Sequence, residues 1–361
     1  MSHLDFTLAL HRAVAPDPRE QVCWSPFSVA SALGLLAHGA HGDSQAELVA
    51  LLGELDEVTE ALAGAARLDE PRPDEDTPLI AVSNTLWADV AISIERTFTD
   101  ELARWSSGAV RNAPFRAEPE KARDTINADV SETTRGLIPE LLPEGTIRSD
   151  TVSSLVNALY LKCGWRNVFD SDATRPRPFH APAGSVEVPT MTLNESVGYA
   201  ALDGWQVVSL PAVGGVEAVV LLPDGDLAEV EPGLTGESLG ALLDAPSTRQ
   251  VLLRLPKLEV STQAELTRPL LELGVRTVFS TEADLTGISP DPLAVQAVLH
   301  ESVLKVDEQG FEGAAATAVM MRLMSLPAEP VEVTVDRPFL FVVRHVGTGV
   351  VYFVARVTDP S

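Results

Sequence analysis

The chain has 361 residues and a formal net charge of −26, and its 26 Lys and Arg residues are scattered without a run of five. With this charge we expect neither a nucleic-acid nor an anionic-membrane partner, because phosphate groups are bound by clustered cations. We likewise expect no heparin-like cofactor. Two cysteines, Cys23 and Cys163, lie in apolar runs and are predicted to be buried free thiols.

The first segment predicts an amphipathic helix over residues 3–14 rather than a targeting signal. It lacks a basic start, and Asp5, His11 and Arg12 interrupt its apolar residues. No run of 18 apolar residues follows, so no transmembrane helix is expected. The compartment stays open: intracellular as the sequence stands, extracellular if a targeting segment has been removed.

Helical patterns dominate the first third of the chain. Residues 25–39 and 43–53 predict two helices, the second starting with Ser44 and Glu47 as a capping box. Periodicity then predicts a strand and an amphipathic helix, at residues 79–88 and 122–133.

The second half is rich in apolar runs of strand length. Residues 153–165 predict a fully buried strand, and further strands are predicted at 216–223, 250–260, 301–308, 339–346 and 350–357. Helices early and strands late are typical of an α+β fold on a large sheet. No linker interrupts the chain, so we expect one domain spanning residues 1–361.

Residues 308–325, EQGFEGAAATAVMMRLMS, fit no ordinary element. Six small residues, 313–318, favour an Ala-rich helix, but no capping residue precedes them. Every second residue from Phe311 to Leu323 forms a face without charge, which suits a strand inside a sheet, although Gly and Ala are poor strand formers. The segment is therefore predicted to exist first as a loop and later as a central strand.

This stretch, with KVDEQG before it and DRPFLFVV after it, resembles the hinge and reactive-centre loop of serpins, and looks closest to a bacterial serpin of the thermopin type. The resemblance covers roughly residues 3–360. It implies a large, mostly antiparallel main sheet with further sheets, about eight or nine helices, and an exposed loop at about 308–337. It also implies a monomeric suicide inhibitor of serine proteases: the loop is cut, and the acyl-enzyme is trapped as the loop inserts into the main sheet.

The resemblance assigns roles within the loop. The hinge must offer small uncharged side chains to the core, since a buried unpaired charge would stall insertion. Seventeen residues counted from the start of the hinge place the scissile bond between Met324 and Ser325. The bait, the residue that fills the specificity pocket of the protease, is then Met324, with Leu323 as the alternative. Either bait implies a chymotrypsin-, elastase- or subtilisin-like target, whereas Arg322 would imply a trypsin-like one and gives a shorter inserting strand. The hinge residues are Glu308, Gly310, Phe311, Gly313, Ala314, Ala315, Ala316, Thr317 and Ala318.

Phe311 departs from the family pattern of Thr, Ser or Val, and its ring is expected to slow the first step of insertion. Two other departures are Asp129, where serpins usually have Trp, and Ala355, where they usually have Gly.

Two supporting clusters are also implied by motif matches. The shutter beneath the sheet contains Ser25, Ser28, Asn157 and His300, and the breach at the end where insertion starts contains Trp165 and a salt bridge of Lys257 with Glu308.

An enzyme is the main alternative class. Ser25, His300 and Asn157 could form a nucleophile, base and orienter, but no G-x-S-x-G turn is present. His38 and His41 lack a third spaced metal ligand, and no cofactor-binding motif appears, so no cofactor is expected. The nearer alternative is a non-inhibitory serpin-fold protein with a binding or chaperone-like role.

Overall fold

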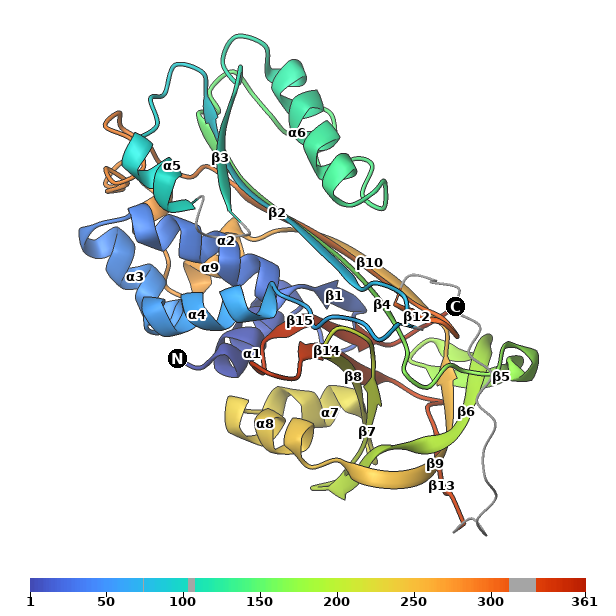
Figure 1. Ribbon diagram of the computed structural model, residues 1–361. Helices are drawn as coiled ribbons and strands as arrows, with labels where there is room; N and C mark the ends of the chain where they lie inside the picture. The colour runs from blue at the N-terminus through green and yellow to red at the C-terminus, as the bar shows by residue number, and fades with distance from the viewer. Residues whose placement is uncertain (74, 103–107, 312–328) are drawn as a thin grey trace.

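The computed structural model describes residues 1–361 except 74, 103–107 and 312–328 (Figure 1). The described residues contain nine α-helices, in line with the expected eight or nine: α1 His3–Val14, α2 Pro26–Gly39, α3 Gly42–Leu52, α4 Leu55–Ala65, α5 Arg96–Leu102, α6 Pro119–Thr133, α7 Leu227–Val230, α8 Gly236–Asp244 and α9 Thr267–Glu272. None of them is long and apolar enough to cross a bilayer.

The main sheet has six strands in the order β10-β11-β12-β4-β2-β3. Most neighbours are antiparallel, the exceptions being β2 with β3 and a direct contact of β11 with β4. The strands are β2 Leu79–Asp89, β3 Ala109–Ala113, β4 Ser153–Gly164, β10 Leu258–Glu265, β11 Val298–Val306 and β12 Gly310–Phe311. The predicted α+β class is confirmed.

A second sheet of nine strands follows the order β1-β15-β14-β8-β7-β6-β9-β13, with β5 added beside β6. The last two predicted strands, β14 and β15, pair as an antiparallel hairpin as expected. Its strands are β1 Val22–Trp24, β5 Arg175–Ala181, β6 Gly184–Leu202, β7 Trp205–Pro211, β8 Val216–Pro223, β9 Ser247–Pro256, β13 Val331–Thr334, β14 Phe339–His345 and β15 Val351–Val357.

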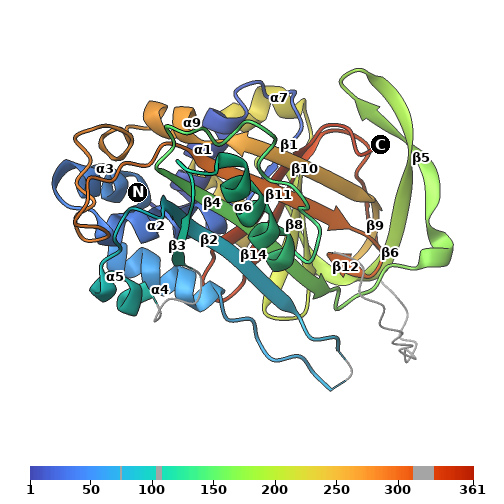
Figure 2. The same cartoon turned by 90° about the horizontal axis from the view of Figure 1, so that it is seen from above.

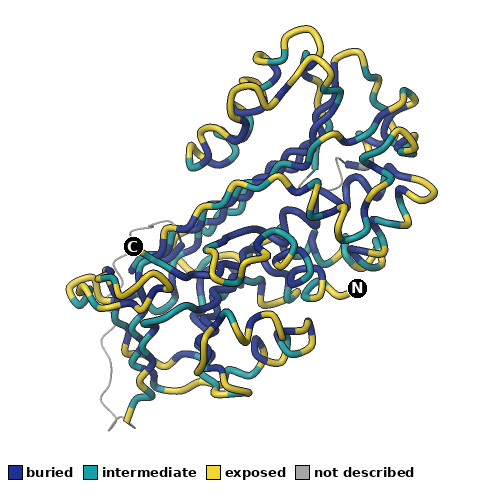
Figure 3. The backbone as a smooth tube through the Cα atoms, turned by 180° about the vertical axis from the view of Figure 1, so that it is seen from behind, coloured by how far each residue is buried: buried dark blue, intermediate teal, exposed yellow. Residues whose placement is uncertain are grey.

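Strand β4 lies between two apolar layers. Leu155 and Leu159 face the large core shared with α2 and the second sheet, whereas Val156 and Ala158 face the cluster beneath α6. Figure 2 shows α6 lying across the outer face of the main sheet, and Figure 3 shows buried residues running the length of these strands. Burial on both faces explains why β4 reads as an unbroken apolar run instead of an alternating one.

Two local predictions were wrong. Ser44 and Glu47 form no capping box, because Glu47 accepts hydrogen bonds from the Thr277 backbone and hydroxyl at 2.7 and 2.8 Å, and Ser44 accepts one from the Asp284 N–H at 3.0 Å. The apolar run at 250–260 is two strands, since the chain leaves β9 at Pro256 and enters β10 of the other sheet. Tertiary partners decided both outcomes.

Candidate functional site

A strand of only two residues, β12, lies between β11 and β4 at one end of the main sheet. At one end β11 and β4 pair directly in parallel, Val298–Glu301 opposite Leu155–Ala158. At the other end β12 separates them, with Phe311 antiparallel to Val306 on one side and Cys163 on the other. We call the space between β4 and β11 the slot.

The hinge enters the slot through Gly310. Its φ is 156°, and an added Cβ would lie 2.2 Å from the Cys163 carbonyl oxygen, so a side chain has no room there. Phe311 follows with 2% exposure, its ring 4.6 Å from that of Trp165 in an edge-to-face contact and 6.4 Å from that of Phe341. The ring expected to hinder entry therefore lies in the core before any cleavage.

The predicted breach residues meet at this end of the slot. Trp165 donates its indole N–H to the Asp307 carbonyl at 2.8 Å. Lys257, at the junction of β9 and β10, lies 2.7 Å from Glu308, which also accepts a 2.7 Å hydrogen bond from Thr174. Burial opposes ionisation of Glu308, but these two donors outweigh it and hold its pKa below the usual value.

The predicted shutter residues form one buried network. His300 accepts a 3.1 Å bond from the Ser25 backbone N–H at Nε2, so its proton lies on Nδ1 and is donated to the Asn157 amide oxygen. Asn157 in turn donates to the Ser28 carbonyl at 2.6 Å. Burial lowers the pKa of His300 to about 3, so the ring is neutral at physiological pH.

Two members of this network were missed from the sequence. Asn84 accepts bonds from both Ser28, at 3.3 Å, and Asn157. Ser302 lies 3.1 Å from His300 and donates to the Cys23 carbonyl at 3.2 Å. The available signal was a polar side chain in the middle of an apolar strand, which is paired when buried.

The geometry does not make a catalytic triad. The Ser25 hydroxyl caps α2 by accepting the Ser28 N–H at 3.1 Å, and His300 bonds the Ser25 backbone instead. The described residues also contain no group of three side chains suited to a metal, and His38 lies 3.2 Å from Thr59. Residues 313–318 of the hinge and Leu323, Met324 and Ser325 of the bait lie outside the described residues.

A second buried polar cluster, away from the slot, had no sequence signal that we recognised. Glu231 accepts two bonds from Arg356, at 2.6 and 2.7 Å, and one from His11 at 2.8 Å. Trp24 donates its indole N–H to the other ring nitrogen of His11 at 3.1 Å, which keeps that ring neutral. Burial lowers the pKa of His11, while His11 and Arg356 outweigh burial at Glu231 and keep its pKa low.

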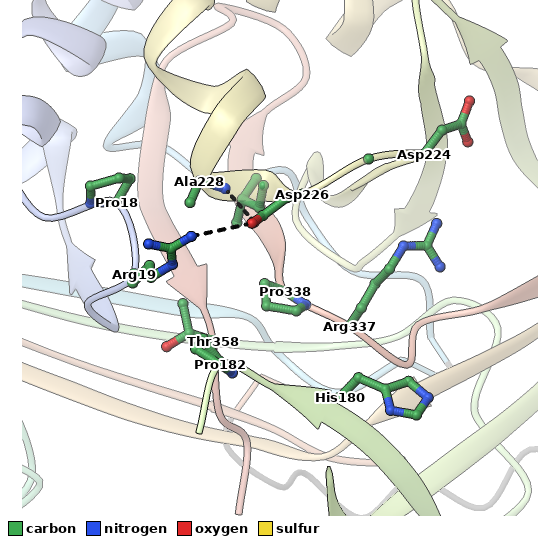
Figure 4. A pocket seen from close by; sticks show the side chains of 12 residues that line it. Pro18, Arg19, His180, Pro182, Asp224, Asp226, Ala228, Arg337, Pro338 and Thr358 are labelled. Atoms are coloured by element: carbon green, nitrogen blue, oxygen red, sulfur yellow. Dashed lines mark hydrogen bonds and ion pairs between the residues drawn. The ribbon is translucent and has the colours of Figure 1, made fainter. Parts of the chain in front are cut away.

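A cavity of about 550 Å³ lies where the loop before β1 meets the start of α7 (Figure 4). Several charged groups in its wall are paired: Arg19 lies 3.5 Å from Asp226, which caps the Ala228 N–H, and Arg337 donates to the Pro223 carbonyl at 2.8 Å and to Asp336 at 3.1 Å.

The family model described as "Serpin (serine protease inhibitor)" matches residues 1–360 of the chain. The chain is a serpin. It is 34% identical to Iripin-2 of Ixodes ricinus, over 98% of this chain and 91% of the relative, and 33% identical to the leukocyte elastase inhibitor of Bos taurus, over 95% and 94%. Serpins are protease inhibitors rather than enzymes, and the resemblance of the loop is thereby explained.

Among solved structures, the fold matches that of thyroxine-binding globulin in complex with thyroxine. The TM-score is 0.87 over 99% of this serpin and 98% of that chain, at 23% identity. At this identity the likeness concerns the fold alone, and it confirms the predicted serpin architecture.

Proposed function

We propose that this serpin is a suicide inhibitor of serine proteases whose loop, once cut, completes the strand begun by β12. The observation that carries the proposal is the position of Phe311, paired with β4 on one side and with β11 on the other. A strand that continues from this point would separate the directly paired ends of β4 and β11.

The register of β12 supports a continuous inserted strand. Extending it one residue at a time brings Val319 opposite Leu155 of β4 and opposite Val298 of β11, which are already partners of each other. Both neighbouring strands therefore require the same register, so insertion needs no slip or bulge. About ten added ladder hydrogen bonds, at ~0.5 to 1.5 kcal/mol each, make the loop-out form a kinetically trapped state.

The same register separates the inserted side chains by charge. Gly313, Ala315 and Thr317 share the face of Phe311 and would enter the core. Glu312 would lie on the outer face between Lys162 of β4 and Lys305 of β11. The one acidic residue at the start of the inserted segment thus meets two cations rather than a hydrophobic core.

The bait and the target follow from the loop sequence. We propose cleavage at Met324–Ser325, with Leu323 as the alternative, by a chymotrypsin-, elastase- or subtilisin-like serine protease. A covalent acyl-enzyme is carried about 50 Å if roughly 15 residues insert at ~3.3 Å each. We further propose a monomer with one domain over residues 1–361. The finer likeness to bacterial serpins of the thermopin type rests on the loop sequence and stays a proposal.

Incubation with chymotrypsin, followed by a denaturing gel and the mass of the released C-terminal peptide, tests this function. A band at the summed mass that survives denaturation, with a peptide beginning at Ser325, is expected. Cleavage without that band but with a large rise in unfolding temperature would indicate insertion too slow to trap the protease. Cleavage with neither band nor rise would instead support the non-inhibitory binding or chaperone-like alternative.

A further inference from the structure

A second cavity, of about 370 Å³, lies on the outer side of the main sheet beside the first residues of β4. Its walls include the segment at residues 145–151, Ser154 of β4, and residues 296–299, where β11 begins. Ile147 and Leu299 in these walls also belong to the apolar layer on the outer face of the sheet. The sheet itself therefore separates this cavity from the large core.

Ser154 brings an unused hydroxyl to this cavity. It is 1% exposed, and no described residue forms a hydrogen bond with its Oγ. Leu155 faces the large core and Val156 the outer layer, so alternation along β4 places Ser154 on the outer face, where the cavity lies. The neighbouring Ser153 donates instead to the Ala294 carbonyl at 2.6 Å. Since buried hydroxyls are normally paired, the free one at Ser154 indicates a partner from outside the chain.

Trp87 of β2 adds a second unused donor beside the first. It is directly opposite Ser154 in the antiparallel register of β2 with β4, so the two side chains share the outer face and their Cβ atoms lie about 5 Å apart. Trp87 is 2% exposed, and its indole N–H has no hydrogen-bond partner among the described residues. The Arg111 guanidinium lies over its ring, 5.7 Å from the centroid, and favours one placement of the ring.

The two unused groups select an acceptor atom. An indole N–H can only donate a hydrogen bond, whereas a hydroxyl can donate or accept one. The atom that satisfies both Trp87 and Ser154 is therefore an acceptor with two lone pairs, and a carbonyl oxygen meets this requirement. Because the two side chains start from neighbouring strands, one oxygen between them can receive both hydrogen bonds.

The rim of the cavity carries opposite charges that balance each other. Arg148 and Asp150 lie 3.5 Å apart, and their side chains are 76% and 73% exposed. Gln296 fixes this segment beside β11, since its amide oxygen accepts the Val152 N–H and its amide nitrogen donates to the Asp150 carbonyl at 3.1 Å. The rim thus has a defined shape and no net charge, which favours an uncharged ligand.

We propose that this cavity binds a small uncharged carbonyl compound with an aromatic body, whose carbonyl oxygen accepts hydrogen bonds from Ser154 and Trp87. The body lies against the apolar wall, which includes Phe279 and Leu299. A carboxylate is disfavoured at the inner end, because Arg111, the cation over Trp87, is already paired with Asp129. The site goes beyond the proposed inhibitory function and does not depend on it.

The test titrates the loop-intact protein with benzamide at millimolar concentrations and measures its Kd by ligand-observed NMR. Toluene, which has no acceptor, and benzoate, which is charged, are the matched probes, and both should bind more weakly than benzamide. Ser154→Ala and Trp87→Phe each remove one hydrogen bond to the ligand, so each should raise the Kd of benzamide about two- to tenfold. Ser149→Ala, at an exposed position in the segment beside the cavity, should leave it unchanged.

The stability of the ligand-free variants separates a binding role from a structural one. Ser154→Ala removes a buried hydroxyl that has no partner within the described chain, so its unfolding temperature without ligand should equal or exceed that of the unaltered protein. A lower unfolding temperature together with an unchanged Kd for benzamide would show that the hydroxyl serves the fold, for example through an internal water, and would overturn the site. No binding of benzamide to the unaltered protein would also overturn it. Binding of toluene or benzoate as tight as that of benzamide would overturn the proposed class of ligand.

Discussion

Lowering the pH from 7.5 to 5.0 should destabilise the loop-intact protein through its buried histidines. His11 and His300 are 1% and 0% exposed, His3 is partly buried, and each of the three accepts an N–H hydrogen bond at a ring nitrogen, which protonation would abolish. Burial lowers the pKa of His3 to about 4 and that of His300 to about 3, and it lowers that of His11 as well. His3 and His300 therefore stay neutral in the folded state across this range and become protonated in the unfolded state, and the pKa of His11 shifts in the same direction.

The sign and size follow from linkage. A depressed histidine pKa contributes stability that is present above the unfolded value, near 6.5, and is lost as the pH falls below it. Between pH 7.5 and 5.0, His3 and His300 each lose about 2 kcal/mol, since one pKa unit is about 1.4 kcal/mol. Glu301 acts in the opposite direction, because burial raises its pKa to about 7. Its side chain is only half buried, so we expect it to offset less than one histidine.

The unfolding midpoint should therefore fall by about 5 °C at pH 5.0, taking a net loss of roughly 4 kcal/mol and the usual unfolding entropy for this chain length. Differential scanning calorimetry across the range measures it. His3→Gln keeps an acceptor for the Val351 N–H but does not titrate, so its midpoint should depend less on pH. His180→Gln, at an exposed position, is the matched control. The reasoning would be refuted by an unfolding midpoint that rises on acidification. It would also be refuted if the midpoint of His3→Gln changed with pH as steeply as that of the control.

Three further predictions concern the slot. Lys257→Ala should lower the unfolding free energy by about 1–2 kcal/mol, because it removes the cation beside the largely buried Glu308 carboxylate. Lys305→Ala is the control: it breaks an ion pair with Glu259, whose side chain is 70% exposed, and should cost under 1 kcal/mol. Chemical denaturation measures both. Phe311→Ala should destabilise the uncleaved protein by about 3 kcal/mol in the same assay, and an unchanged midpoint would contradict the burial of its ring. Ala315→Glu should abolish the covalent band with chymotrypsin while Ala314→Glu keeps most of it; equal bands would contradict the inserted register.

Much of the site could be anticipated from motifs that resemble those of serpins. The motif around Asn157 and the HESV motif at His300 lie on neighbouring strands in direct register, so their side chains had to meet once the parallel contact formed. Lys257 and Glu308 were likewise placed together correctly, although the break in strand at Lys257 was not anticipated. Motif matches work here because they carry the family's register with them.

Other features of the structure were not indicated by any motif match. The long strand β6 and its neighbour β5 were not predicted, since their mixed burial gives neither a clean alternation nor a continuous apolar run. The partners of Glu47, and of Glu231 in its pair with Arg356, lie more than 100 residues away, beyond any local pattern.

The amino-acid sequence by itself determined the α+β class, the small-residue hinge and the alternation that keeps charge off its inserting face. These properties are local, because side-chain size, charge and period act within a few residues. Only the tertiary structure decided that Phe311 already occupies the slot and that β4, β11 and β12 share one mutual register. Those facts depend on which strands become neighbours, and strand order is fixed by the packing of the whole chain.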